Sequence, residues 1–216
     1  MEGKLGDKIQ TKLFDYGRKE MDHLLDVDPI LGLAITRLGH LKRQVMPDLF
    51  PALVYNIVSQ LVSLKSAETV WRNMIESFGI ISSENLVLFS ADDIQKCGMT
   101  MKKAVCIKDV SELSLNKELD LGNFKNLSDD EVIAQLTKVK GIGRWTAEMI
   151  LILSMERPDV LSFGDLAIRK GMEKLYNIEK LSKEQFEKYK NLYTPYGSVA
   201  SIYLWELSHI GEEYWR

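Results

Sequence analysis

The segment Lys138–Ile150, KVKGIGRWTAEMI, places two glycines, Gly141 and Gly143, one residue apart at the start of an apolar helical run. Glycine permits positive φ and lets a backbone approach another molecule closely, so the pair predicts a tight turn between two helices. Amides at the start of the second helix point outward beside the positive end of the helix dipole, which suits a phosphate oxygen. The alternative is an αα-hairpin whose glycines only tighten the turn.

Helical periodicity continues through nearly all of the chain. Apolar residues mark one helix face over 53–62, a break follows at Ser63, and a second apolar pattern runs over 67–78 to a C-cap at Gly79. No alternating run is long enough to predict a strand. The sequence therefore predicts an all-α fold.

Serine N-caps mark further helix starts in the sequence. Three of them have the capping partner three residues on: Ser90 with Asp93, Ser128 with Glu131, and Ser182 with Gln185. The last helix is expected from near Pro195 through Trp205, because proline is tolerated in a first helical turn. These signals predict about ten helices.

We expect residues 1–216 to form a single domain of two helical lobes around a cleft, connected by irregular segments at 45–53 and 156–165. One lobe is expected to hold approximately residues 1–47 and 160–216, and the other approximately 48–159 with the hairpin 136–150.

Composition indicates a globular protein, with 45% hydrophobic and 27% charged residues. No run of eighteen apolar residues and no export signal in MEGKLGDKIQTKLF is visible, so we expect no membrane partner and a cytoplasmic location, or a nuclear one in a eukaryote. Cys97 and Cys106 are too few for an iron–sulfur cluster and are expected to be buried apolar residues. His23, His40 and His209 lack metal-ligand spacing, so no catalytic metal is expected.

The net charge of −3 does not by itself indicate a nucleic-acid partner. Charge is uneven, however, because residues 138–174 contain seven basic and five acidic side chains, with Lys102 and Lys103 upstream. A local basic face can contact phosphate even when the whole chain is acidic.

Several ordered motifs resemble one family. The hairpin, PALVYNIVSQLVSLKSAETVW (51–71), IQKCGMTMKKAVCIKDV (94–110) and VLSFGDLAIRK (160–170) together resemble the helix-hairpin-helix DNA glycosylase superfamily, over roughly residues 28–205. Within it the chain is most similar to bacterial DNA-3-methyladenine glycosylase II. The resemblance implies a helix-hairpin-helix (HhH-GPD) fold and double-stranded DNA containing damaged bases as the partner of a monomeric enzyme.

The resemblance also assigns the hairpin residues. It implies DNA-backbone contacts from Lys140, Gly141, Ile142, Gly143, Arg144 and Thr146. Backbone carbonyls of Thr137, Val139 and Ile142 are expected to hold a structural Na⁺ or K⁺ that bridges to the phosphate. No cofactor for catalysis is expected.

Asp165 opens the apolar helix DLAIRKGMEKLY, 22 residues beyond Gly143. It is a good N-cap, and a carboxylate held by helix-start amides stays ionised and fixed in direction. The resemblance implies that Asp165 is also the catalytic residue. Breaking an N-glycosidic bond builds positive charge on the deoxyribose, which a fixed anion stabilises, and the carboxylate can orient or deprotonate the attacking water. Asp159 does not match the motif and is expected to be a surface charge.

Trp145 stands where family members that also cut the DNA backbone have a lysine nucleophile. Indole cannot replace that amine, and the guanidinium of Arg144 is too basic to do so, so we expect no lyase activity. By resemblance Trp145 and Trp205 line the base pocket, where aromatic faces suit positively charged alkylated purines. Met149 replaces a pocket aromatic. A helical tryptophan such as Trp145 can also be a core residue.

Leu61 matches the family's intercalating residue, with Gln60 beside it at the loop edge. An apolar wedge stabilises an opened duplex after the target base has been flipped out. The alternative is that Leu61 continues the apolar face of its helix.

The predicted function is therefore that of a monofunctional DNA repair glycosylase that hydrolytically excises alkylated purines of the 3-methyladenine and 7-methylguanine type and leaves an abasic site. Two alternatives stay open. One is a superfamily glycosylase for uracil, thymine or oxidised guanine, and the other is a non-catalytic DNA-binding module. The extra N-terminal β domain of bacterial DNA-3-methyladenine glycosylase II is not predicted here, and Lys140 replaces a proline that is common in the hairpin.

Overall fold

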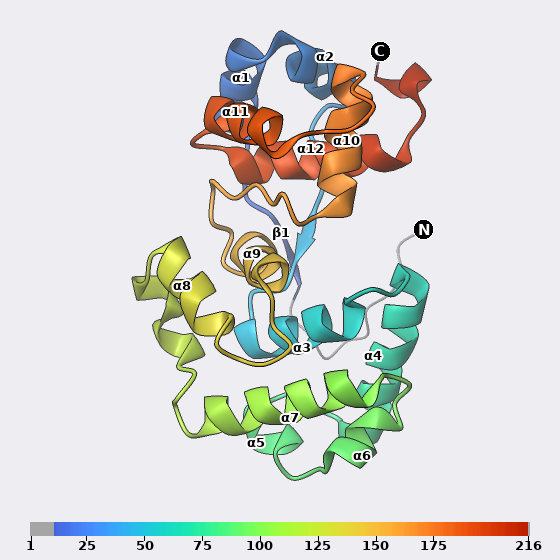
Figure 1. Ribbon diagram of the computed structural model, residues 1–216, viewed down its shortest axis with the longest axis vertical. Helices are drawn as coiled ribbons and strands as arrows, with labels where there is room; N and C mark the ends of the chain where they lie inside the picture. The colour runs from blue at the N-terminus through green and yellow to red at the C-terminus, as the bar shows by residue number, and fades with distance from the viewer. Residues whose placement is uncertain (1–10, 216) are drawn as a thin grey trace. The chain divides into compact units, whose positions relative to one another are not determined.

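The computed structural model describes residues 11–215, and within them the chain forms twelve α-helices, two 3₁₀ helices and two strands of two residues each (Figure 1). The all-α prediction is confirmed. Residues 1–10, on which the expectation of a missing export signal partly rests, lie outside the described residues. Within the described range no helix is both long and apolar enough to cross a membrane.

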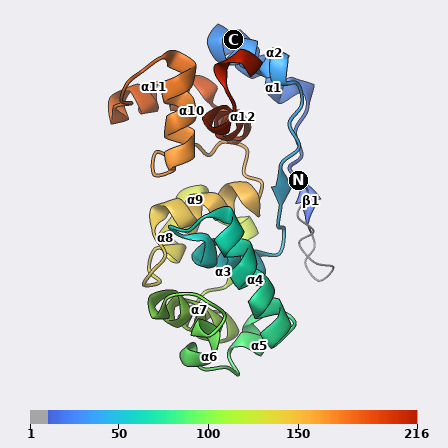
Figure 2. The same cartoon turned by 90° about the vertical axis from the view of Figure 1, so that its right-hand side faces the viewer.

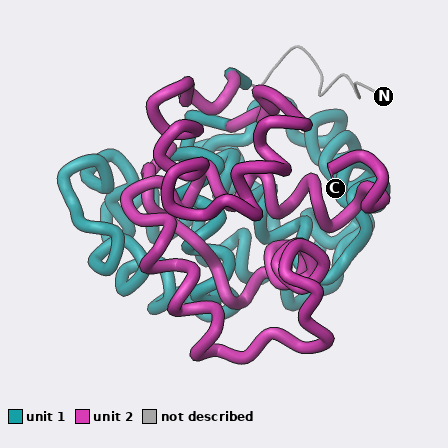
Figure 3. The backbone as a smooth tube through the Cα atoms, turned by 90° about the horizontal axis from the view of Figure 1, so that it is seen from above, with its two compact units in different colours: residues 1–12, 46–155 teal, residues 13–45, 156–216 magenta. Residues whose placement is uncertain are grey.

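The described residues divide into two compact units (Figure 3). Residues 11–12 and 46–155 belong to unit 1, and residues 13–45 and 156–215 belong to unit 2. Each unit has its own buried apolar residues, so each is described by itself.

Unit 1 is built around α3, in which eight of eleven residues are buried. Its helices are α3 (Leu49–Ser59), α4 (Leu64–Phe78), α5 (Ser83–Leu86), α6 (Ala91–Gln95), α7 (Met101–Leu115), η1 (Leu121–Asn126), α8 (Asp129–Leu136) and α9 (Arg144–Leu153). Helix α3 packs against α4, α7 and α9, and α5 and α6 pack on α7 (Figures 1 and 2). Because α9 directly follows the glycine turn, its packing on α3 fixes where the turn lies in this unit.

Unit 2 is built around the crossing of two helices, α10 and α12. Its elements are β1 (Lys12–Leu13, at the unit boundary), α1 (Arg18–Val27), α2 (Pro29–Leu38), β2 (Gln44–Val45), α10 (Leu166–Tyr176), α11 (Lys183–Tyr193), α12 (Gly197–His209) and η2 (Glu212–Tyr214), with β1 pairing to β2. A Cβ at Gly171 of α10 would lie 2.1 Å from the Leu204 carbonyl oxygen of α12. Only glycine therefore lets the two backbones meet this closely.

A buried polar network fixes the start of α2. Asp28 accepts hydrogen bonds from the amides of Ile30 and Leu31 (2.9 and 3.1 Å) through Oδ1. Its Oδ2 accepts the hydroxyl protons of Tyr176 and Tyr193, which joins α2 to α10 and α11. Burial raises the pKa of both Tyr176 and Tyr193 above the ordinary value of a tyrosine hydroxyl.

The helix starts predicted from serine caps are confirmed. Ser90, Ser128 and Ser182 each accept the amide of the third helical residue in a complete capping box. Ser63 caps α4, which ends at Gly79 with φ 74°.

Two helix boundaries differ from the prediction. Helix α3 ends at Ser59, so Leu61 does not continue its apolar face. Helix α12 begins at Gly197, two residues after Pro195, where Asp159 accepts the Gly197 amide at 3.0 Å. Asp159, expected to be a surface charge, is half-buried, and its carboxylate also satisfies a helix-start amide.

Candidate functional site

The two glycines of the hairpin differ in what they require. Gly141 has φ 99°, and a Cβ there would lie 3.0 Å from the Cys106 Sγ atom on α7. Gly143 has φ −94° and ψ 172°, which any residue adopts, and a Cβ there would meet nothing within 4 Å. Conformation and packing thus explain Gly141, whereas Gly143 leaves an open approach to the backbone at the start of α9.

The side chain of Cys106 packs against Gly141. Its side chain is buried, and this burial, with the nearby Asp109 carboxylate, raises the pKa of the thiol to about 11. A protonated, buried thiol is chemically inert and behaves as a small apolar residue. The expectation that Cys97 and Cys106 are buried is confirmed.

Helix α9 begins without a side-chain cap. Its N-cap is Gly143, which has no side chain to accept an amide proton. Thr146 in the first turn is buried, and the exposed Arg144 donates from Nε to Glu148 Oε1 at 2.8 Å. Amides of an uncapped first turn suit an external anion at the positive end of the helix dipole.

Gln60 joins the end of α3 to the hairpin. Its Nε2 donates to the Gly141 carbonyl oxygen at 3.1 Å and to Thr146 Oγ1 at 3.0 Å. The next residue, Leu61, has φ 55° and a side chain that is 104% exposed. The two residues predicted for the wedge thus point to different surroundings: Gln60 to the hairpin and Leu61 to solvent.

The other predicted residues of α9 and the turn differ in burial. Trp145 is half-buried, whereas Met149 is only 3% exposed and belongs to the buried face of α9. In the turn, Thr137 and Lys140 are exposed, Val139 and Ile142 are buried, and the Ile142 amide donates to the Val139 carbonyl oxygen at 3.1 Å.

Asp165 lies at the N-cap of α10 in unit 2 and is 7% exposed. Its Oδ1 accepts the Ile168 amide at 2.9 Å and the indole Nε1–H of Trp205 at 3.2 Å. The N-cap role considered from the sequence is therefore present. These two hydrogen bonds help to fix the orientation of the carboxylate.

Arg43 completes this group, although no sequence pattern indicates it. Its guanidinium carbon lies 4.5 Å from the centre of the Trp205 ring. Such stacking attracts a cation to the ring face and fixes the plane of the indole. Arg43 precedes β2 in an irregular segment, 162 residues from Trp205 in the chain, so neither periodicity nor a motif could pair the two.

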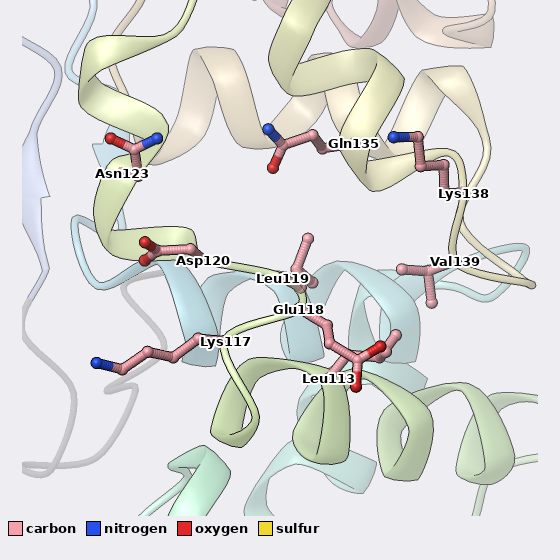
Figure 4. Close-up of a pocket in the computed structure, with 9 residues that line it drawn as sticks. All are labelled: Leu113, Lys117, Glu118, Leu119, Asp120, Asn123, Gln135, Lys138 and Val139. Carbon is pink, nitrogen blue, oxygen red and sulfur yellow. The ribbon is translucent and has the colours of Figure 1, made fainter.

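A separate pocket of about 500 Å³ lies in unit 1 near the ends of α7 and α8. Figure 4 shows Asp120 and Asn123 on one side and Lys138 and Val139 on the other. The full lining is Leu113, Lys117, Glu118, Leu119, Asp120, Asn123, Gln135, Lys138 and Val139. Val139 alone among the predicted site residues lines it, so this pocket is distinct from the hairpin contacts described above.

The predicted residues therefore fall into two groups. In unit 1 the structure joins Gln60 to the hairpin at Gly141 and Thr146. In unit 2 it joins Asp165 to Trp205. An uncapped helix start after a glycine turn and a buried, oriented aspartate are the features on which the sequence-based hypothesis of a DNA-repair protein depends.

Comparison with known proteins gives the class directly. Residues 54–195 match the HhH-GPD superfamily of base excision DNA repair proteins, so the chain belongs to this superfamily. The matched region contains the hairpin and Asp165.

Individual relatives are similar over most of their length. A DNA-3-methyladenine glycosylase of Schizosaccharomyces pombe is 27% identical over 168 residues, covering 76% of this chain and 74% of the relative. The solved structure of an S. pombe 3-methyladenine DNA glycosylase in complex with abasic DNA has a TM-score of 0.81 at 25% identity, covering 90% of this chain and 98% of the other. A DNA-3-methyladenine glycosidase from Bacillus halodurans has a TM-score of 0.78 at 29% identity, covering 93% of both chains.

Proposed function

We propose that this protein is a monofunctional DNA glycosylase that removes alkylated purines, of the 3-methyladenine and 7-methylguanine type, from double-stranded DNA. Membership of a base excision repair superfamily and the similarity to proteins named 3-methyladenine DNA glycosylases support this substrate class. The observation that carries the proposal is the buried Asp165 carboxylate, oriented by the Ile168 amide and the Trp205 indole.

The chemistry assigned to Asp165 is electrostatic. As the bond between C1′ and the base nitrogen breaks, the electron pair leaves with the base and positive charge develops on the sugar. The fixed carboxylate stabilises that charge and orients the attacking water, whose oxygen bonds to C1′ while its proton is released. Alkylation at N3 or N7 already gives the purine a positive charge, so the leaving base needs no strong general acid.

The hairpin is assigned to the DNA backbone. The amides at the uncapped start of α9 and the open approach at Gly143 suit a phosphate oxygen, a contact that holds the strand without reading its sequence. Carbonyl oxygens of Thr137, Val139 and Ile142 are hard donors of the kind that bind Na⁺ or K⁺, and such an ion would add positive charge beside that phosphate. The Val139 oxygen accepts one hydrogen bond, which leaves its second lone pair for an ion.

The identity of residue 145 determines whether the DNA strand is cut after the base is released. Trp145 has no amine that could form a Schiff base with the sugar, so the product is an intact strand with an abasic site.

A panel of duplexes, each with a single lesion, tests the proposal by mass spectrometry of the released base. The panel contains 3-methyladenine, 7-methylguanine, uracil, thymine mispaired with guanine, and 8-oxoguanine. Release of the methylated purines without strand scission, and scission only after alkali, is the expected result. Release of another base alone would identify a different glycosylase, and DNA binding without release of any base would identify a binding module.

A further inference from the structure

The end of α3 is held by a lysine from another helix. The Lys103 ammonium on α7 donates to the carbonyl oxygens of Val58 and Gln60, at 2.7 and 2.6 Å. The last carbonyls of a helix have no partner within the helix, and a cation suits the negative end of its dipole. Lys103 is half-buried, and this partial burial lowers the pKa of its ammonium.

Gln60 continues this connection to the hairpin. Its backbone oxygen accepts from Lys103, while its side chain donates to Gly141 and to Thr146. Hydrogen bonds therefore run from α7 through one residue to the turn before α9. All of these residues belong to unit 1.

Leu61 follows Gln60 directly and has an unfavourable conformation. A left-handed φ of 55° is unfavourable for a residue with a Cβ, and full exposure leaves the leucine's apolar surface in water. Such a conformation persists only where neighbouring contacts hold it in place. Two sets of contacts hold the residue before Leu61 in this way. Lys103 donates to the backbone oxygen of Gln60, and the Gln60 side chain donates to the hairpin.

We propose that Lys103 and Gln60 are positioning residues that hold Leu61 in a fixed relation to the phosphate-binding hairpin, so that the leucine enters the base stack where the hairpin holds the strand. This inference rests on the proposed function. Ordering the loop during folding removes an entropy cost that would otherwise arise when the duplex is opened. Lys103 and Gln60 thereby assist base flipping and leave the bond-breaking step unchanged.

The chain offers two matched controls for Lys103→Met. Lys108, on the same helix, donates to the Val87 carbonyl oxygen at 2.5 Å, so Lys108→Met removes a similar contact away from the hairpin. Lys102 is exposed beside Lys103, so Lys102→Met removes the same charge without the contact to α3.

The test compares two substrates under single-turnover conditions. In one, 7-methylguanine is paired with cytosine, and in the other it lies opposite an abasic site, where less stacking and pairing must be broken. We expect Lys103→Met to slow excision from the paired duplex about tenfold and excision from the opened duplex less than about threefold. The larger effect is of the size expected when one hydrogen bond to a charged group is lost. Both control variants should keep the wild-type ratio between the two substrates.

Equal slowing on both substrates would overturn the inference, because a merely structural role affects every substrate alike. A fall of about one in the salt slope of DNA binding for Lys103→Met, beyond that for Lys102→Met, would also overturn it by making Lys103 a phosphate contact. If the wild-type protein releases no base from either duplex, the proposed function fails first.

A double-mutant cycle tests Gln60 separately. If Gln60 acts through Leu61, Gln60→Ala should slow paired-duplex excision severalfold in the wild-type background and have almost no effect in the Leu61→Ala background. Additive effects of the two substitutions would show that Gln60 does not act through the leucine.

Discussion

Helices α9 and α10 begin in opposite ways. The N-cap of α9 is Gly143, which has no side chain, whereas the N-cap of α10 is Asp165, whose carboxylate accepts the Ile168 amide. Every helix start presents unpaired amides at the positive end of a dipole. At the start of α9 no N-cap side chain accepts these amides, whereas α10 uses one of them to orient the Asp165 carboxylate.

The comparison of these two helix starts also distinguishes two roles of the buried Asp165 carboxylate, as a helix cap and as an oriented charge. Asp165 is buried with two donors, so it is both a helix cap and a directed negative charge. A cap alone needs only the amide, and the bond from Trp205 is an addition that no helix requires. Substitutions that keep the cap and change the charge therefore distinguish the two roles.

The largest effect is expected from Asp165→Asn. Asparagine caps a helix about as well as aspartate, so the free energy of unfolding should change by less than about 0.5 kcal/mol. Excision should fall by roughly 100-fold or more because the charge facing the sugar is lost. Single-turnover release of 7-methylguanine and thermal unfolding measure the two quantities. Unchanged release would remove Asp165 from the mechanism, and a large loss of stability would show that its charge is structural.

A smaller effect is expected from Trp205→Phe. This change keeps an aromatic face for Arg43 and removes the Nε1–H that donates to Asp165. A hydrogen bond to a charged group contributes roughly 1.5–3 kcal/mol, so excision should slow at least about tenfold. The comparison with Asp165→Asn shows whether the two changes act on one group. If the double variant is slower than Asp165→Asn by a further tenfold, Trp205 acts independently of the carboxylate.

The hairpin glycines should respond differently to alanine. Gly141→Ala places a Cβ at positive φ against Cys106 and should destabilise the protein by roughly 1–3 kcal/mol. Gly143→Ala meets open space at an ordinary φ, so stability should stay nearly unchanged while DNA affinity falls a fewfold. Denaturant unfolding and a binding titration at fixed salt measure both. Wild-type affinity of Gly143→Ala would argue against close backbone approach at this position.

The smallest functional effect is expected from Ser128→Ala at the start of α8. Ser128 and Glu131 form a complete capping box, so unfolding should become easier by about 1 kcal/mol. Excision by the folded protein should be unchanged, because this helix start binds only its own chain. Slower excision at temperatures well below unfolding would show that α8 also takes part in binding DNA.

Local chemistry explains what the sequence could predict. The caps at Ser90, Ser128 and Ser182 involve residues three apart, so the pattern alone locates them, and the turn at Gly141 follows equally from its neighbours. The motif containing Asp165 was recognisable because its N-cap is local as well.

Contacts between distant segments explain what the sequence could not predict. Apolar residues at 61 and 62 suggested a longer α3, but Lys103 takes the carbonyls at its end from 43 residues away. Arg43 reaches Trp205 across most of the chain, and Asp159 caps α12 from 38 residues away. Neither helical periodicity nor capping rules contain such information, and so the end of α3 and the start of α12 are the boundaries that differ from the prediction.

The close crossing of α10 and α12 at Gly171 has a genetic consequence. Any side chain there would collide with the Leu204 carbonyl and push α10 away from α12, which separates Asp165 from Trp205, because the two residues lie on those two helices. A screen for alleles that leave cells sensitive to methylating agents should therefore recover changes at codon 171, although the atoms nearest to an added Cβ there belong to Leu204. Inherited loss of repair would then trace to the spacing of two backbones.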